Sequence, residues 1–100
     1  MTSLSISEPE RRGWGFLTSH ALTLLELAKT PDVTVRDLSR RTNLTERQTH
    51  RVLDDLVKNG YVKRTRIGRR NRYSVDSSRP MRDASVAHHR IAALIGALVS

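Results

Sequence analysis

Between residues 34 and 76 the sequence changes its hydrophobic pattern from helical to strand-like, and few folds accommodate this order. Helical patterns cover residues 34–41 and 45–58, and runs typical of strands cover residues 61–67 and 72–76. A short polar stretch ending in Leu44, which is expected to fill the corner, separates the two helical patterns. The sequence therefore predicts two short helices joined by a tight turn and followed by a β-hairpin, in a mainly α fold with a small β part (α+β).

Local signals mark where these elements begin and end. In a capping box, two side chains three residues apart satisfy free backbone amides at a helix start. The pairs that fit this pattern are Thr34 with Asp37 and Thr45 with Gln48. Asn43 tolerates the left-handed conformation of a tight turn, and Asn59-Gly60 is a typical helix stop. Residues 68–71, Gly-Arg-Arg-Asn, predict the turn of the hairpin.

Two further helical patterns flank this unit. Apolar residues at helical spacing predict a helix over residues 19–29, capped by Thr18 or Ser19 and ended by residues 30–32. Trp14 and Phe16, just before this helix, are expected to pack beneath the domain, and the alternative is a binding role. A last helix is predicted over residues 80–99. Its apolar residues follow a heptad spacing and are Ala84, Ala87, Ile91, Leu94 and Leu98.

The length of 100 residues allows one domain. We divide the chain into a flexible polar arm (residues 1–12), the helix-turn-helix and hairpin unit (13–76) and a C-terminal helix (77–100). The chain has no cysteine, which excludes disulfides and thiolate metal sites. Residues 1–12 lack the apolar run of a signal peptide, and the longest apolar stretch, residues 91–99, is too short to span a membrane.

The charge of the chain is strongly positive and unevenly placed. The formal net charge is +8, and 11 of the 18 Lys and Arg residues lie between Arg40 and Arg72, where only three acidic residues occur. A small basic protein of this kind usually binds a polyanion, either nucleic acid or an anionic membrane surface. The alternative is a cationic protein that is merely soluble, but the clustering indicates a binding surface.

The segment from Val35 to Tyr73, VRDLSRRTNLTERQTHRVLDDLVKNGYVKRTRIGRRNRY, resembles the winged helix-turn-helix transcription regulators of the MarR and ArsR type. The features that carry the resemblance are Asp37-Leu38, Leu44, the Leu53/Leu56 pair, Gly60-Tyr61-Val62 and Gly68-Arg69-Arg70. The resemblance implies a DNA-binding winged helix whose wing is the hairpin. Thr49 departs from the family pattern, because a buried Val or Ile usually stands there. Its hydroxyl can bond to a carbonyl one turn earlier, so we expect the helix to form.

In such a fold the second helix of the motif enters the major groove with its N-terminal half against the base edges. Arginine there can pair with guanine and glutamine with adenine, whereas phosphate contacts only position the protein. The residues predicted to bind DNA from this helix are Thr45, Arg47, Gln48, His50 and Arg51, with Thr45 on a phosphate. Those predicted from the preceding helix are Arg36 and Arg40, both on phosphates. Those predicted from the wing are Arg66, Arg69, Arg70, Asn71 and Arg72. The alternative is that these polar side chains only solvate exposed faces.

Proteins of this type dimerise through terminal helices and bind inverted repeats, so the resemblance implies a homodimer. The interface would be the apolar face of the last helix at the five heptad positions given above. The alternative is that this helix folds back over the helix at residues 19–29. A small-molecule effector, if one exists, would bind between the last helix and the DNA-binding unit.

Some ArsR-type proteins bind metals through Asp and His of the last helix, and Asp83, His88 and His89 lie there. Adjacent helical residues point about 100° apart, so we predict no metal site, and no cofactor. No phosphate loop or nucleophile motif indicates an enzyme. The sequence predicts a dimeric, sequence-specific regulator of transcription that binds double-stranded DNA, a repressor, in the cytoplasm with the nucleoid. The alternatives are an architectural DNA-binding protein and a winged helix that binds RNA or protein.

Overall fold

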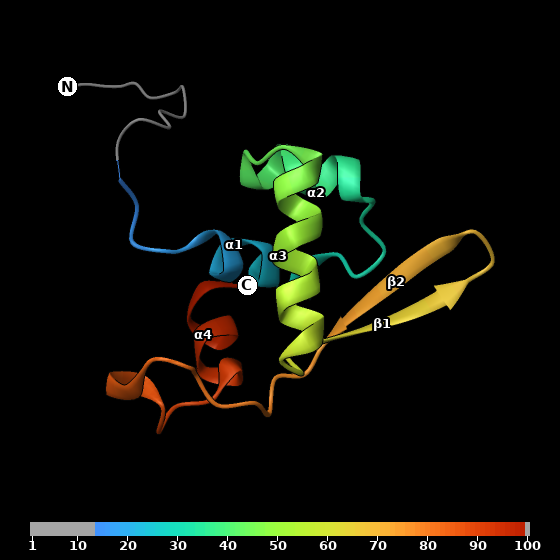
Figure 1. The fold of residues 1–100 in the computed structure, drawn as a ribbon. Coiled ribbons are helices and arrows are strands. Elements are labelled where there is room, and N and C mark those ends of the chain that lie inside the picture. The colour runs from blue at the N-terminus through green and yellow to red at the C-terminus, as the bar shows by residue number, and fades with distance from the viewer. Residues whose placement is uncertain (1–13, 100) are drawn as a thin grey trace.

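The computed structural model describes residues 14–99 and has the mainly helical α+β architecture that the sequence predicts (Figure 1). The elements in chain order are α1 (Ser19–Lys29), α2 (Val35–Thr42), α3 (Glu46–Lys58), β1 (Val62–Ile67), β2 (Arg70–Val75), the short 3₁₀ helix η2 (Ala84–Val86) and α4 (Ile91–Leu98). The arm expected over residues 1–12 lies outside the described residues. No helix within residues 14–99 is long and apolar enough to cross a membrane.

The helix ends form as the local signals predict. The Thr18 and Thr34 side chains accept hydrogen bonds from backbone amides three residues on, each at 3.1 Å. Asn43 takes the left-handed conformation (φ 57°, ψ 40°). Its N–H bonds to carbonyls in the last turn of α2, which ends the helix. The capping box expected at α2 is only half formed, because the Asp37 carboxylate lies 3.5 Å from Arg40 instead.

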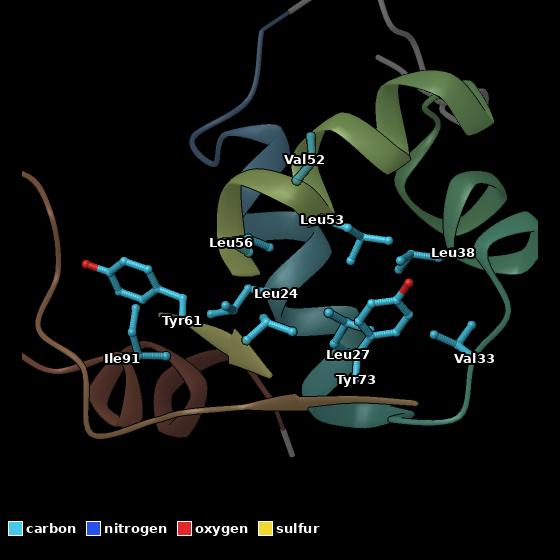
Figure 2. Packing of buried hydrophobic residues seen from close by; sticks show 11 residues of the cluster. Leu24, Leu27, Val33, Leu38, Val52, Leu53, Leu56, Tyr61, Tyr73 and Ile91 are labelled. Carbon is cyan, nitrogen blue, oxygen red and sulfur yellow. The ribbon is translucent and has the colours of Figure 1, made fainter. Parts of the chain in front are cut away.

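One apolar core joins the three helices of the unit to the base of the hairpin. Figure 2 shows side chains of α1, α2 and α3 converging on one cluster. The cluster consists of Leu24, Leu27, Val33, Leu38, Val52, Leu53, Leu56, Tyr61, Val62, Tyr73 and Ile91. Thr49 is fully buried on α3, and its hydroxyl donates to the Thr45 carbonyl at 2.8 Å. The polar residue at this position is therefore accommodated as predicted.

The hairpin is more regular than the sequence indicates. The strands pair antiparallel from Val62↔Val75 to Ile67↔Arg70, so the turn contains only Gly68 and Arg69. Gly68 has φ +62°, which suits the first central position of a type II′ hairpin turn. The turn predicted over residues 68–71 is therefore two residues too long. The hairpin projects from the helices (Figure 1), and most of its distal residues are exposed.

The prediction of one helix over residues 80–99 is wrong, because residues 80–90 make a different structure. Pro80 and Arg90 form an antiparallel bridge. The Met81 amide donates to the His89 carbonyl at 2.9 Å, and the Ile91 amide donates to the Arg79 carbonyl at 2.8 Å. These backbone groups cannot also join a continuous helix. The α-helix begins only at Ile91.

Helix α4 packs against α1, and Ile91 belongs to the core. Within the described residues the chain thus follows the alternative in which the last helix folds back over residues 19–29. The packing expected for Trp14 and Phe16 is wrong: their exposed fractions are 82% and 92%. The two rings contact each other edge to face, with centroids 5.1 Å apart, and no core residue covers them.

Candidate nucleic-acid interface

Helix α3 presents one buried and one exposed face, as a groove-binding helix requires. Thr49, Val52, Leu53 and Leu56 are buried against the core. Arg47, His50 and Arg51 lie on the exposed face, and their side chains have no hydrogen bond or ion pair within residues 14–99. Three predicted base-reading side chains therefore share one accessible face of the N-terminal half of this helix.

The other two predicted residues of this helix, Thr45 and Gln48, form a capping box. The Thr45 hydroxyl accepts from the Gln48 amide at 3.0 Å, and the Gln48 Oε1 accepts from the Thr45 amide at 2.9 Å. Recognition of adenine by glutamine needs both Oε1 and Nε2. Because Oε1 already holds the helix start, Gln48 is less suited to base reading than the sequence indicates, although its Nε2 can still donate.

The predicted phosphate-binding residues of α2, Arg36 and Arg40, are both exposed. The Arg36 guanidinium has no partner within residues 14–99, whereas Arg40 lies near the Asp37 carboxylate, as described above. This second pair is exposed, so a phosphate would compete with the Asp37 carboxylate for the Arg40 guanidinium.

The wing arginines differ in their availability. The Arg69 side chain lies at the turn and has no partner within the described part of the chain. The Arg66 Nε donates to the Gly68 carbonyl at 2.9 Å. Arg70 Nη2 donates to the backbone carbonyl of Asp32 at 2.8 Å, and Arg72 Nε lies 3.4 Å from the carboxylate of the same residue. Of the four wing arginines predicted to bind DNA, three therefore already contact oxygen atoms of the protein.

Two acidic residues outside the predicted site fix the hairpin to the helices. Asp32, between α1 and α2, contacts β2 as described. Asp54, on the outer face of α3, accepts a hydrogen bond from Arg64 of β1 at 2.8 Å. The guanidinium of Arg64 also lies 5.9 Å from the ring centre of Tyr73. The pairing register and the proximity of α3 to β1 create these contacts, and no local sequence signal identifies them.

The residues predicted to form the dimer interface do not lie on one helical face. Ala84 belongs to η2 and Ala87 follows it, both exposed and outside α4. On α4, Ile91 is buried in the core, Leu94 is half-buried and Leu98 is half-exposed. The structure therefore does not bring the five residues together as a heptad seam.

A cleft of about 490 Å³ lies between α1, the end of α3 and α4. Ala21, Leu24, Leu56 and Leu94 are among the residues that form its apolar wall. This cleft lies between the last helix and the DNA-binding unit, the place expected for an effector. The His20 Nε2 and Asp55 Oδ2 atoms, 2.9 Å apart, join α1 to α3 at this cleft.

The histidines near the C-terminus contact each other: the ring centres of His88 and His89 are 4.2 Å apart. Within residues 14–99, no group of three or more His, Asp or Glu side chains is placed to hold a metal ion.

Comparison with known protein families agrees with this geometry. A model of the MarR family matches residues 14–72, which is more than half of the chain and includes α1, α2, α3 and most of the hairpin. No curated protein matches the sequence.

Proposed function

Because the chain belongs to the MarR family of DNA-binding transcription regulators, we propose that it is a sequence-specific repressor that binds double-stranded DNA as a homodimer. Members of this family are regulators rather than enzymes. Family membership establishes a DNA-binding regulator of transcription. Sequence specificity, the homodimer, an inverted-repeat binding site and repression are the parts that we propose. Repression is the simplest mode of action for such a protein, because blocking polymerase requires only occupancy of the DNA. The proposed place of action is the cytoplasm, with the nucleoid.

The observation that carries the proposal is the exposed face of α3. Arg47 and Arg51 are one helical turn apart, exposed, and without an ion-pair partner within residues 14–99. Arginine pairs bidentately with guanine O6 and N7 in the major groove. Asp54 and Asp55 follow Arg51 at spacings that allow ion pairs along a helix, but their carboxylates contact Arg64 and His20 instead.

The remaining cations fit a role in holding the protein on the duplex. Arg36 and Arg40 on α2 lie on the element before the recognition helix, and Arg69 projects from the wing tip. Phosphate contacts of this kind set the register of a protein without reading sequence. In the proposed complex the wing lies along the backbone or enters the minor groove, where narrow A·T tracts attract arginine.

The proposed dimer uses exposed apolar residues on both sides of α1. Trp14 and Phe16 precede this helix, and α4, with Leu98 50% exposed, packs against it (Figure 1). Large aromatic residues left in water are typical of surfaces that another chain covers. We expect Leu98→Asp to give monomers by light scattering, whereas Val86→Asp, on the exposed η2, leaves the dimer intact. A dimer that persists in Leu98→Asp would exclude α4 from the interface.

The direct test is selection from a pool of random duplexes at moderate and high salt, followed by sequencing of the bound fraction. We expect enrichment of an inverted repeat with half-sites about 10 base pairs apart. Binding without enrichment that is lost at high salt would instead identify an architectural DNA-binding protein. A protein that binds no duplex would contradict the proposal and direct the search to RNA or protein partners.

Variants then assign the bases. Arg47→Ala and Arg51→Ala should each weaken binding to the selected site by about 5- to 150-fold and relax the preference at one guanine. The control Arg82→Ala removes the same charge from an exposed residue outside α2, α3 and the wing. Equal effects in all three variants would show that only overall charge matters.

A further inference from the structure

Asp32 is the one acidic residue in the described part of the chain that contacts two wing arginines. It lies in the loop between α1 and α2, against strand β2. Its backbone carbonyl accepts from Arg70 Nη2 at 2.8 Å, and its carboxylate pairs with Arg72 Nε at 3.4 Å. Neighbouring loop residues Val33 and Thr34 line a small hollow together with Arg70. The loop and the strand are thus joined side by side.

The two contacts depend on different groups of Asp32. A substitution of the side chain leaves the carbonyl that holds Arg70 and removes only the charge that faces Arg72. Both members of the ion pair are largely in water, with 53% of the Arg72 side chain and 67% of the Asp32 side chain exposed. The pair is therefore able to open, and a phosphate group would compete with the carboxylate for the same guanidinium.

We propose that Asp32 is a positioning residue of the wing, which holds Arg72 away from the DNA backbone and so limits sequence-independent binding. The proposal rests on the proposed function. Non-specific binding derives almost entirely from cations that neutralise phosphates and release counterions. An arginine that is already paired within the protein contributes less to that release. The carboxylate of Asp32 thereby lowers the affinity of the wing for any duplex.

The first measurement needs no DNA. In the full-length protein, the ¹H–¹⁵N resonance of the Arg72 Nε–H group reports on its contact with Asp32. We expect Asp32→Asn to shift this resonance. The control Asp83→Asn, which removes the same charge from an exposed residue outside the wing, should not shift it. An Arg72 resonance that is unchanged in Asp32→Asn would overturn the positioning role.

The second measurement is the salt dependence of binding to a random-sequence duplex between 50 and 200 mM salt. Release of one arginine should steepen the slope of log K against log [salt] by up to about 0.9, which corresponds to at most about a 3.5-fold greater loss of affinity over this range. Asp32→Asn should show this change, and Asp83→Asn should keep the wild-type slope.

A double-mutant cycle separates the pair from simple charge removal. In an Arg72→Gln background, Asp32→Asn should no longer steepen the slope, because no guanidinium remains to be released. A slope change of equal size in both backgrounds would overturn the proposal. A wild-type protein that binds no duplex would refute the proposed function and the DNA part of this inference, while the Nε resonance would still decide whether Asp32 holds the wing.

Discussion

Two buried threonines offer a sharp test of how this small core is held together. Thr23 on α1 and Thr49 on α3 both have an exposed fraction of 0%. The Thr49 hydroxyl donates to the Thr45 carbonyl, whereas the Thr23 Oγ1 has no hydrogen-bond partner in the described structure. Replacement by valine keeps the branched shape and replaces the hydroxyl by a methyl group. We predict that Thr23→Val stabilises the protein and that Thr49→Val leaves its stability nearly unchanged.

The magnitudes follow from the bonding of each hydroxyl. A buried polar group without a partner costs about 1–3 kcal/mol, and valine and threonine have similar helix propensities. Thr23→Val should therefore raise the free energy of unfolding by about 1–2 kcal/mol. In Thr49→Val, a lost hydrogen bond worth about 1 kcal/mol is offset by a buried methyl group of similar value. The Thr45 carbonyl keeps its bond from the Thr49 backbone amide at 2.9 Å, so no acceptor is left unpaired.

Urea unfolding followed by circular dichroism measures both effects. All variants should be compared at one protein concentration, because dimer formation would raise apparent stability. For a domain of this size, 1 kcal/mol corresponds to about 4–8 °C in Tm. A midpoint for Thr23→Val at or below the wild-type value would refute the reasoning, as would an equal gain in Thr49→Val. Either result would mean that hydrogen bonding of the hydroxyl does not decide the free-energy cost of burying it.

Two further predictions concern the hairpin and the segment that follows it. Hydrogen bonds from the Ser78 side chain and amide lower the pKa of Asp76, so the ionised carboxylate stabilises the fold fully above about pH 5 and loses this effect as the pH falls through its folded pKa. In urea unfolding, the stability advantage of wild type over Asp76→Asn should therefore shrink between pH 7 and pH 3. A difference that stays constant over this range would contradict the prediction. Gly60 has φ +84° and a Cβ there would lie 2.9 Å from the Arg79 guanidinium, so Gly60→Ala should cost about 1–2 kcal/mol by thermal unfolding. Gly68→Ala, with φ +62° but open space around it, should cost less, and the reverse order would show that the contact with Arg79 is irrelevant.

The sequence predicts best those features whose cause lies within about four residues. The capping box of Thr45 and Gln48, the left-handed Asn43 and the back-bonded hydroxyl of Thr49 are all confirmed. Each depends on a side chain that meets the backbone of its own turn, so neighbouring residues suffice to identify it. The order of the elements follows from the same local signals.

Predictions that needed knowledge of packing partners were wrong. Ala84 and Ala87 continue the heptad spacing of Ile91, but alanine buries little area and gives a helix over residues 80–90 little support. The bridge between Pro80 and Arg90 satisfies the backbone there instead. Trp14 is expected to be buried but is exposed instead. The sequence shows that an aromatic residue is present, but not whether this chain supplies a surface to cover it.

The same distinction changes which residues carry the argument for DNA recognition. The cluster of arginines in the wing is the most conspicuous charge in the sequence, yet Arg72 is paired with an acid from a distant loop and Arg70 is bonded to that loop's backbone. Arg47 and Arg51, fewer in number, have no such partner within residues 14–99. A count of charged residues along the chain predicts that the binding partner is negatively charged. The cations able to read bases are those that the fold leaves unpaired on a rigid element. Specificity should therefore respond more to Arg47 and Arg51 than to any wing residue.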